Sequence, residues 1–164
     1  MKKICRSILC ALIVVTCAWR LPPAGVLAEA SAHDAHEHFA AGEPGDPKKP
    51  FRVVKVTMLE DGKAMLFAPA VVEVHRGEQV RFEIFNEGSW DHEFVLATEE
   101  ANRKHAELMK KFPDMEHADP NALRLSPLSA GAILWKFTRT GTFEFACLIP
   151  GHREAGMHGE VIVK

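Results

Sequence analysis

The sequence predicts an all-β protein, an antiparallel sandwich of two sheets with one inserted helix. Two observations support this class: apolar and polar residues alternate in short runs, and turn signals separate these runs. The alternation is clearest in Val80–Ile84 and Ile133–Phe137, where every second side chain is apolar. Successive side chains of a strand point to opposite faces, so each run indicates a half-buried strand. Strands do not alternate regularly with helices, as they would around a parallel sheet.

About seven short strands are expected on this basis. Turn signals such as Asp61-Gly62 and Thr140-Gly141 separate them. We assign the folded domain to residues 51–164. Its expected strands are Phe51–Leu59, Val71–Val74, Val80–Ile84, Phe94–Ala97, Ile133–Phe137, Thr142–Ala146 and Glu160–Val163.

One segment departs from the strand pattern. Thr98–Lys111 is rich in charge and contains neither Gly nor Pro. Acidic residues near its start and basic residues at its end suit the helix macrodipole, and Pro113 follows the expected stop. The segment is therefore predicted to be a helix. Its apolar face is predicted to carry Ala101, His105, Leu108 and Phe112.

The N-terminal residues 1–30 have the layout of a secretory signal peptide. Basic residues precede the apolar run Ile8–Trp19, and small residues follow it. The run is about 12 residues long, short of the roughly 20 that a membrane span needs. Two cleavage sites are plausible, one before Ser31 and one before His33, and we take the site before Ser31 as the start of the mature chain. The mature protein is then expected to be periplasmic, without a membrane span, and to begin with a flexible leader over residues 31–50.

Charge excludes one class of partner. The whole chain has a formal net charge of -2. Removal of residues 1–30 takes away four basic residues and one acidic residue, which leaves the mature chain at -5. No basic stripe remains to neutralise phosphates, so we do not expect a nucleic acid partner. We expect a monomer.

The cysteine count points to a specific site. Three of the four cysteines lie in the signal segment, which leaves Cys147 alone in the mature chain. An unpaired thiol in an oxidising compartment is either buried in the core or bound to something. Cys147, His152 and Met157 follow one another at intervals of five. With 9 His and 6 Met in 164 residues, this coincidence has a chance probability of about 0.002.

Strand parity brings a fourth residue towards this group. Phe143, Phe145 and Cys147 share one face of their strand, so the sulfur should point into the core. The same argument places His92 inward, on the face of Phe94. Two imidazoles, a thiolate and a weak thioether are the ligands of a blue-copper site, whereas structural zinc prefers four strong ligands. We therefore predict one copper ion held by His92, Cys147, His152 and Met157. The alternative is a core cysteine beside a surface histidine and a packing methionine.

These residues resemble the cupredoxins, and among them the small periplasmic members associated with copper tolerance. The likeness covers residues 51–164 and is most specific in the run from Phe143 to Met157, with His92 upstream. It implies a Greek-key β-sandwich, a type 1 copper site and one-electron chemistry. Glu93 follows the first histidine where many members carry Asn or Ser, and no histidine adjoins Cys147 as it does in multicopper oxidases. We therefore expect an electron carrier that cycles between Cu(I) and Cu(II) and serves periplasmic copper handling or tolerance, not an enzyme. Its redox partner protein is expected to dock near His152.

A copper-sequestering or copper-delivery protein with additional Cu(I) sites is the alternative function. It rests on two further candidate sites. His105, Met109, Met115 and His117 form a soft set for Cu(I), although His105 can equally pack on the apolar face of its helix, with Met115 and His117 exposed and without a role. The leader histidines His33, His36 and His38 form a candidate Cu(II) site, which depends on a mature terminus at Ser31, and a solvated tail explains them as well.

Overall fold

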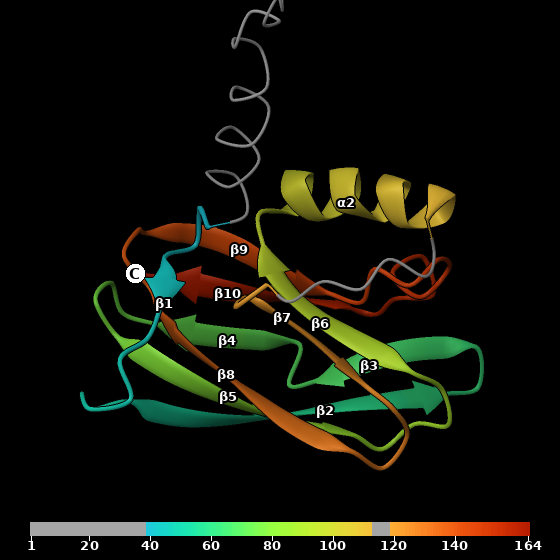
Figure 1. Cartoon of the computed structure of the whole chain (residues 1–164), viewed down its shortest axis with the longest axis horizontal. Coiled ribbons are helices and arrows are strands. Elements are labelled where there is room, and N and C mark those ends of the chain that lie inside the picture. Colours follow the sequence, from blue (N-terminus) through green and yellow to red (C-terminus); the bar gives the residue numbers. More distant parts are fainter. Residues whose placement is uncertain (1–38, 113–118) are drawn as a thin grey trace, which may run out of the picture.

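Two five-stranded sheets pack face to face in the computed structural model, which describes residues 39–112 and 119–164 (Figure 1). One sheet has the strand order β1-β8-β5-β2-β3 and the other β4-β10-β9-β6-β7. The strands are β1 Glu43–Pro44, β2 Arg52–Asp61, β3 Ala64–Ala68, β4 Val71–Val74, β5 Gln79–Asn86, β6 His92–Ala97, β7 Ala122–Leu125, β8 Ala130–Lys136, β9 Gly141–Ala146 and β10 His158–Val163. The helix α2 spans Glu99–Lys111.

The predicted β-sandwich with one inserted helix is confirmed. The pairing is mixed, however, and not purely antiparallel as expected. β2 pairs with β5, and β4 with β10, in parallel. The chain leaves the first sheet after β3, adds β4 to the second sheet and returns at β5, so β5 enters beside β2 in the same direction. Strand alternation reports burial but not the direction of a neighbour, which is why the sequence did not reveal these pairs.

The core lies between the sheets and consists of the inward-facing side chains that the alternation predicted. Phe82 and Trp135 of one sheet and Phe94 and Phe145 of the other are all fully buried. Phe94 and Phe145 stack with ring centroids 5.0 Å apart. This aromatic layer ends at Cys147 and Met157, which belong to the same buried cluster.

Helix α2 covers the outer face of the second sheet, above β6 and β9 (Figure 1). Thr98 caps its start by accepting a hydrogen bond from the Ala101 amide at 3.1 Å. The predicted helical face is partly wrong: Leu108 and Phe112 are exposed, whereas Met109 is fully buried. Met109 packs with Val95, Ala146 and Leu148 in a second apolar cluster. The helix is thus rotated so that Ala101, His105 and Met109 face the sheet.

The domain begins earlier than the predicted boundary at Phe51. Within the predicted leader, Ala41 is fully buried and the Phe39 ring stacks on Trp135 at 5.8 Å. Strand β1 then pairs with β8 through Glu43 and Pro44. Residues 39–50 therefore pack against the sandwich, and their assignment to a flexible leader was wrong. A two-residue strand is too short for an alternation pattern to reveal. The predicted signal peptide and leader residues 31–38 lie outside the described residues.

No helix in the described part of the chain is long and apolar enough to cross a membrane.

Candidate metal centre

His92, Cys147 and His152 come together at one end of the sandwich. His92 is the first residue of β6, Cys147 follows β9, and His152 lies in the loop between β9 and β10. One potential ligand atom from each of the three lies within 4.8 Å of the others. His92 Nδ1 is 3.2 Å from His152 Nδ1, which is 3.3 Å from Cys147 Sγ. Three of the four predicted ligands therefore converge, and His92 and Cys147 point inward as strand parity predicted.

Met157 lies at the far end of the same loop and is fully buried. Its carbonyl accepts a hydrogen bond from the Cys147 amide at 3.0 Å, and its own amide donates to the His152 carbonyl at 3.1 Å. These bonds close the loop on itself, so the residue stays beside both other loop ligands. The fully buried side chain belongs to the same core cluster as Cys147. Coordination by its sulfur stays a prediction.

The sulfur of Cys147 is held by the main chain of the neighbouring strand. The Glu93 amide donates a hydrogen bond to Cys147 Sγ at 3.3 Å. Burial raises the pKa of the Cys147 thiol to about 12, and this hydrogen bond only partly opposes the effect. Because the donor is a backbone amide, the contact does not require the Asn or Ser that many cupredoxins carry at this position. Glu93 can therefore replace them without loss of this bond.

The two histidines differ in their access to water. His92 is fully buried, whereas His152 is partly exposed. Burial, and then the nearby His92, lowers the pKa of His152, so this imidazole is held in the neutral form that binds a metal. A buried thiol and two converging imidazoles form a soft donor set that suits both Cu(I) and Cu(II).

A carboxylate that we did not predict adjoins the cluster. Glu60 Oε1, near the end of β2, lies 3.1 Å from His92 Nε2, on the ring nitrogen that does not face His152. Partial burial would raise the pKa of this carboxyl, but hydrogen bonds from Ser89, His92 and Trp90 hold it below the ordinary value. A sequence signal was present: Glu60 continues the inward-facing series Val56 and Met58, which is an unusual place for a charge.

The ligand loop is tied to the helix side of the sandwich by a largely buried ion pair. Arg153 donates to Glu144 Oε1 from its Nη2 atom at 2.7 Å, and the Glu144 side chain is only 7% exposed. Asn102 of α2 donates to the other oxygen of the same carboxylate at 3.0 Å. On the opposite side, the Met65 amide of β3 donates to the Ala155 carbonyl at 3.1 Å. The loop is thereby held between α2 and the β2–β3 hairpin (Figure 1).

Of the remaining predicted ligands, the two described residues, His105 and Met109, do not join this centre. In the second candidate site, Met109 is fully buried in the apolar cluster beneath α2, and His105 faces the same way. Met115 and His117 lie outside the described residues, as do His33, His36 and His38. Both additional sites stay predictions.

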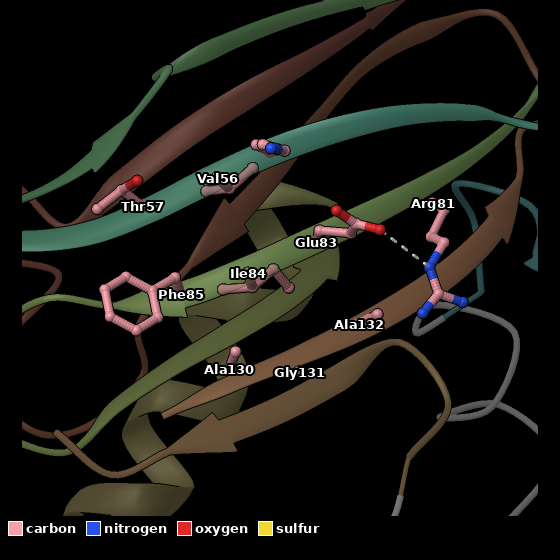
Figure 2. Close-up of a pocket in the computed structure, with 10 residues that line it drawn as sticks. Val56, Thr57, Arg81, Glu83, Ile84, Phe85, Ala130, Gly131 and Ala132 are labelled. Carbon is pink, nitrogen blue, oxygen red and sulfur yellow. Dashed lines mark ion pairs between the residues drawn. The ribbon is translucent and has the colours of Figure 1, made fainter. Parts of the chain in front are cut away.

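A surface depression lies on the other sheet and contains none of the predicted ligands. It is formed on β2, β5 and β8, where the small residues Ala130, Gly131 and Ala132 leave space beside Phe85 (Figure 2). Arg81 and Glu83, both on β5, form an ion pair of 3.5 Å in its lining. We assign it no part in metal binding.

Comparison with known proteins agrees with this geometry. Residues 54–164 match the family model of copper binding proteins of the plastocyanin/azurin family. The chain therefore belongs to this family of cupredoxins. Together with the His–Cys–His cluster, this membership makes copper the metal of the centre and supports a type 1 site.

Curated relatives point to copper resistance. The chain is 50% identical over 137 residues to the copper-resistant cuproprotein CopI of Rubrivivax gelatinosus, which covers 84% of this chain and 80% of the relative. The copper-resistant cuproprotein CopI of Pseudomonas aeruginosa is 33% identical to this chain over 170 residues, which covers 85% of this chain and 92% of the relative. Among solved structures, auracyanin B matches with a TM-score of 0.61 and 24% identity over 76% of this chain and 96% of its own. This last likeness supports the fold alone.

Proposed function

We propose that this protein is an exported mononuclear blue-copper protein that carries single electrons and serves copper tolerance in the periplasm. The observation that carries the proposal is the convergence of His92, Cys147 and His152 on one point within the core. The 50% identity to a copper-resistant cuproprotein supports the link to tolerance. The predicted signal peptide supports the periplasmic location.

His92, Cys147, His152 and Met157 would hold the copper ion, which would supply one-electron chemistry. The chain itself provides a preset ligand geometry. The loop hydrogen bonds and the Arg153–Glu144 pair hold the donors in place, so little rearrangement accompanies a change of oxidation state. Burial of His92 and Cys147 excludes water from the inner side. Because only His152 reaches the surface, we propose that electrons enter and leave through its exposed edge.

A visible absorption and EPR titration with Cu(II) tests the copper site. The mature domain should develop an intense thiolate-to-copper band that saturates at one equivalent. The matched variant Cys147→Ser should lack the band, because it keeps the shape but removes the thiolate. A colourless wild type with an ordinary Cu(II) spectrum would refute the blue-copper assignment.

We further propose that a redox partner docks around His152. Ile149, Pro150 and Ala155 surround it in the loop, and Pro150 is exposed. Leu148 of the same loop is buried beneath α2 and cannot contact a partner. Ile149→Glu should slow electron exchange with a partner, and Leu108→Glu on α2 serves as the control at an exposed apolar residue. The docking assignment is wrong if both variants exchange at the wild-type rate while both remain folded.

Copper sequestration without a dedicated electron-transfer role is the second candidate, and it is favoured by the copper-resistance relatives. The two candidates differ in stoichiometry. A carrier binds one copper per chain, whereas a sequestering protein binds further Cu(I) without colour. In copper-stressed cells, Cys147→Ser should abolish protection if tolerance depends on the blue site and should leave it intact if other sites store the metal.

A further inference from the structure

Glu60 is a charged residue on the core-facing side of its strand. It follows Val56 and Met58 along the inward face of β2, and those two side chains are almost completely buried. The Glu60 side chain is 19% exposed. A carboxylate in such a position is costly unless it is well bonded, so its partners show what it does.

The Glu60 carboxylate is fully engaged at the metal centre. Ser89 donates its backbone amide to both oxygens, at 2.9 and 3.1 Å, and Trp90 donates its amide to Oε1 at 3.1 Å. His92 Nε2 lies 3.1 Å from the same Oε1 atom. The local backbone leaves room for this arrangement: a Cβ atom on Gly88 would lie 2.5 Å from Glu60 Oε1 and 3.0 Å from His92 Nε2.

The contact between Glu60 and His92 decides which ring nitrogen of His92 is free of a proton. An ionised carboxylate only accepts hydrogen bonds, so His92 Nε2 must carry the proton. In a neutral imidazole the other nitrogen, Nδ1, then holds a lone pair, and Nδ1 is the atom that faces His152 at 3.2 Å. Without Glu60, a proton on Nδ1 would instead be stabilised by donation to His152 Nδ1, which would block the metal position.

We infer that Glu60 is a positioning residue for copper: it fixes the Nε2–H form of His92, directs Nδ1 to the metal and favours Cu(II) over Cu(I) through its negative charge. The inference rests on the proposed blue-copper function. A carboxylate bonded to the far nitrogen of a ligand histidine raises the basicity of that ligand. The more basic ligand stabilises the more highly charged ion, which lowers the reduction potential.

Measurement of the copper reduction potential tests the effect of the negative charge on Glu60. Glu60→Gln keeps the size and an oxygen acceptor but removes the charge. We expect it to lower Cu(II) affinity about tenfold, at the lower end of the usual effect of such partners, and to affect Cu(I) affinity less. A full tenfold fall in the ratio of the Cu(II) affinity to the Cu(I) affinity corresponds to a rise of about 59 mV in the reduction potential for one electron. Glu87→Gln is the matched control. Glu87 is exposed and lies in the β5–β6 loop, which also carries Ser89 and Trp90, and its substitution should leave the reduction potential unchanged.

The tautomer is tested without copper. Nitrogen-15 NMR of the apo protein at pH 8 should show His92 protonated at Nε2 in the wild type and in Glu60→Gln, and a population protonated at Nδ1 in Glu60→Ala. An unchanged potential in Glu60→Gln, or an Nδ1–H wild type, would overturn the inference even though the wild type binds copper and turns blue. Failure of the wild type to form the blue band would instead refute the proposed function, and the NMR result would still report on Glu60.

Discussion

The Glu93 amide donates a hydrogen bond to Cys147 Sγ at 3.3 Å, which joins the start of β6 to the end of β9 at the metal centre. The two residues are 54 positions apart in the chain. This bond gives the thiolate a fixed donor when copper is bound. In the absence of copper it is too weak to offset burial, and the pKa of the thiol stays near 12.

Copper binding is therefore expected to release a proton from Cys147. Between pH 7.5 and 9 the buried thiol remains protonated, so copper must displace one proton to bind the thiolate. The apparent affinity should rise about tenfold per pH unit in this range. Competition titrations against a chelator of known affinity at several pH values measure the slope. An affinity independent of pH would show that the apo protein already holds a thiolate.

The same shift affects the stability of the apo protein at high pH. The pKa of Cys147 is higher in the folded protein than the ordinary value of 9.0, so the unfolded chain loses this proton first as pH rises. The free energy of unfolding should thus fall above about pH 9, with a smaller fall in Cys147→Ser. Urea unfolding at pH 8 and pH 10 tests this. Equal losses in the two proteins would assign the effect to other groups.

Met157→Leu tests the axial ligand. Leucine has a similar volume but no sulfur, so copper should remain bound by the three strong ligands and the visible band should persist. Loss of a weak donor removes support from Cu(II) more than from Cu(I), so the reduction potential should rise. Voltammetry measures the shift, with Met109→Leu as a control at a methionine of the other cluster. Equal potentials in Met157→Leu and the wild type would exclude Met157 as a ligand.

Arg153→Met tests the clamp on the ligand loop. The substitution leaves the Glu144 carboxylate, which is 7% exposed, without its cationic partner. Breaking a buried pair in this way costs several kcal/mol, and because Arg153 is itself 24% exposed we expect a loss of about 2 kcal/mol in the free energy of unfolding. Lys104→Met removes the exposed pair with Glu100 and should cost about 0.5 kcal/mol or less. Similar losses in both variants would show that the Arg153 pair is no more than a surface contact.

Met109→Leu separates the two readings of the second copper site. Met109 is fully buried among apolar residues, so leucine should be tolerated at a cost below about 1.5 kcal/mol and copper stoichiometry should not change. Met109→Ala should cost about 2 to 5 kcal/mol, because it leaves a cavity beneath α2. Equilibrium unfolding and a Cu(I) titration measure the two quantities. A lower Cu(I) stoichiometry in Met109→Leu would support the additional site.

Much of the sandwich and three of its converging ligands were predictable from the sequence. The alternation around Phe82 and Phe145 identified strands and their inward faces, and the spacing from Cys147 to His152 identified the loop. These patterns are local, since the geometry of a strand or a short loop depends on neighbouring residues. The helix was located correctly, but its buried face was not, because Leu108 and Met109 are both apolar and only the sheet beneath α2 selects between them.

Local residue patterns thus determined the fold class, the copper ligands that we propose and the loop that carries three of them. Tertiary structure alone decided the contacts around those ligands: Glu60 on His92, the Glu93 amide on Cys147, and Phe39 on Trp135. The physical reason is that each of these pairs joins segments far apart in the chain. Their meeting depends on strand order and register across the sheets, which the composition of either segment does not specify.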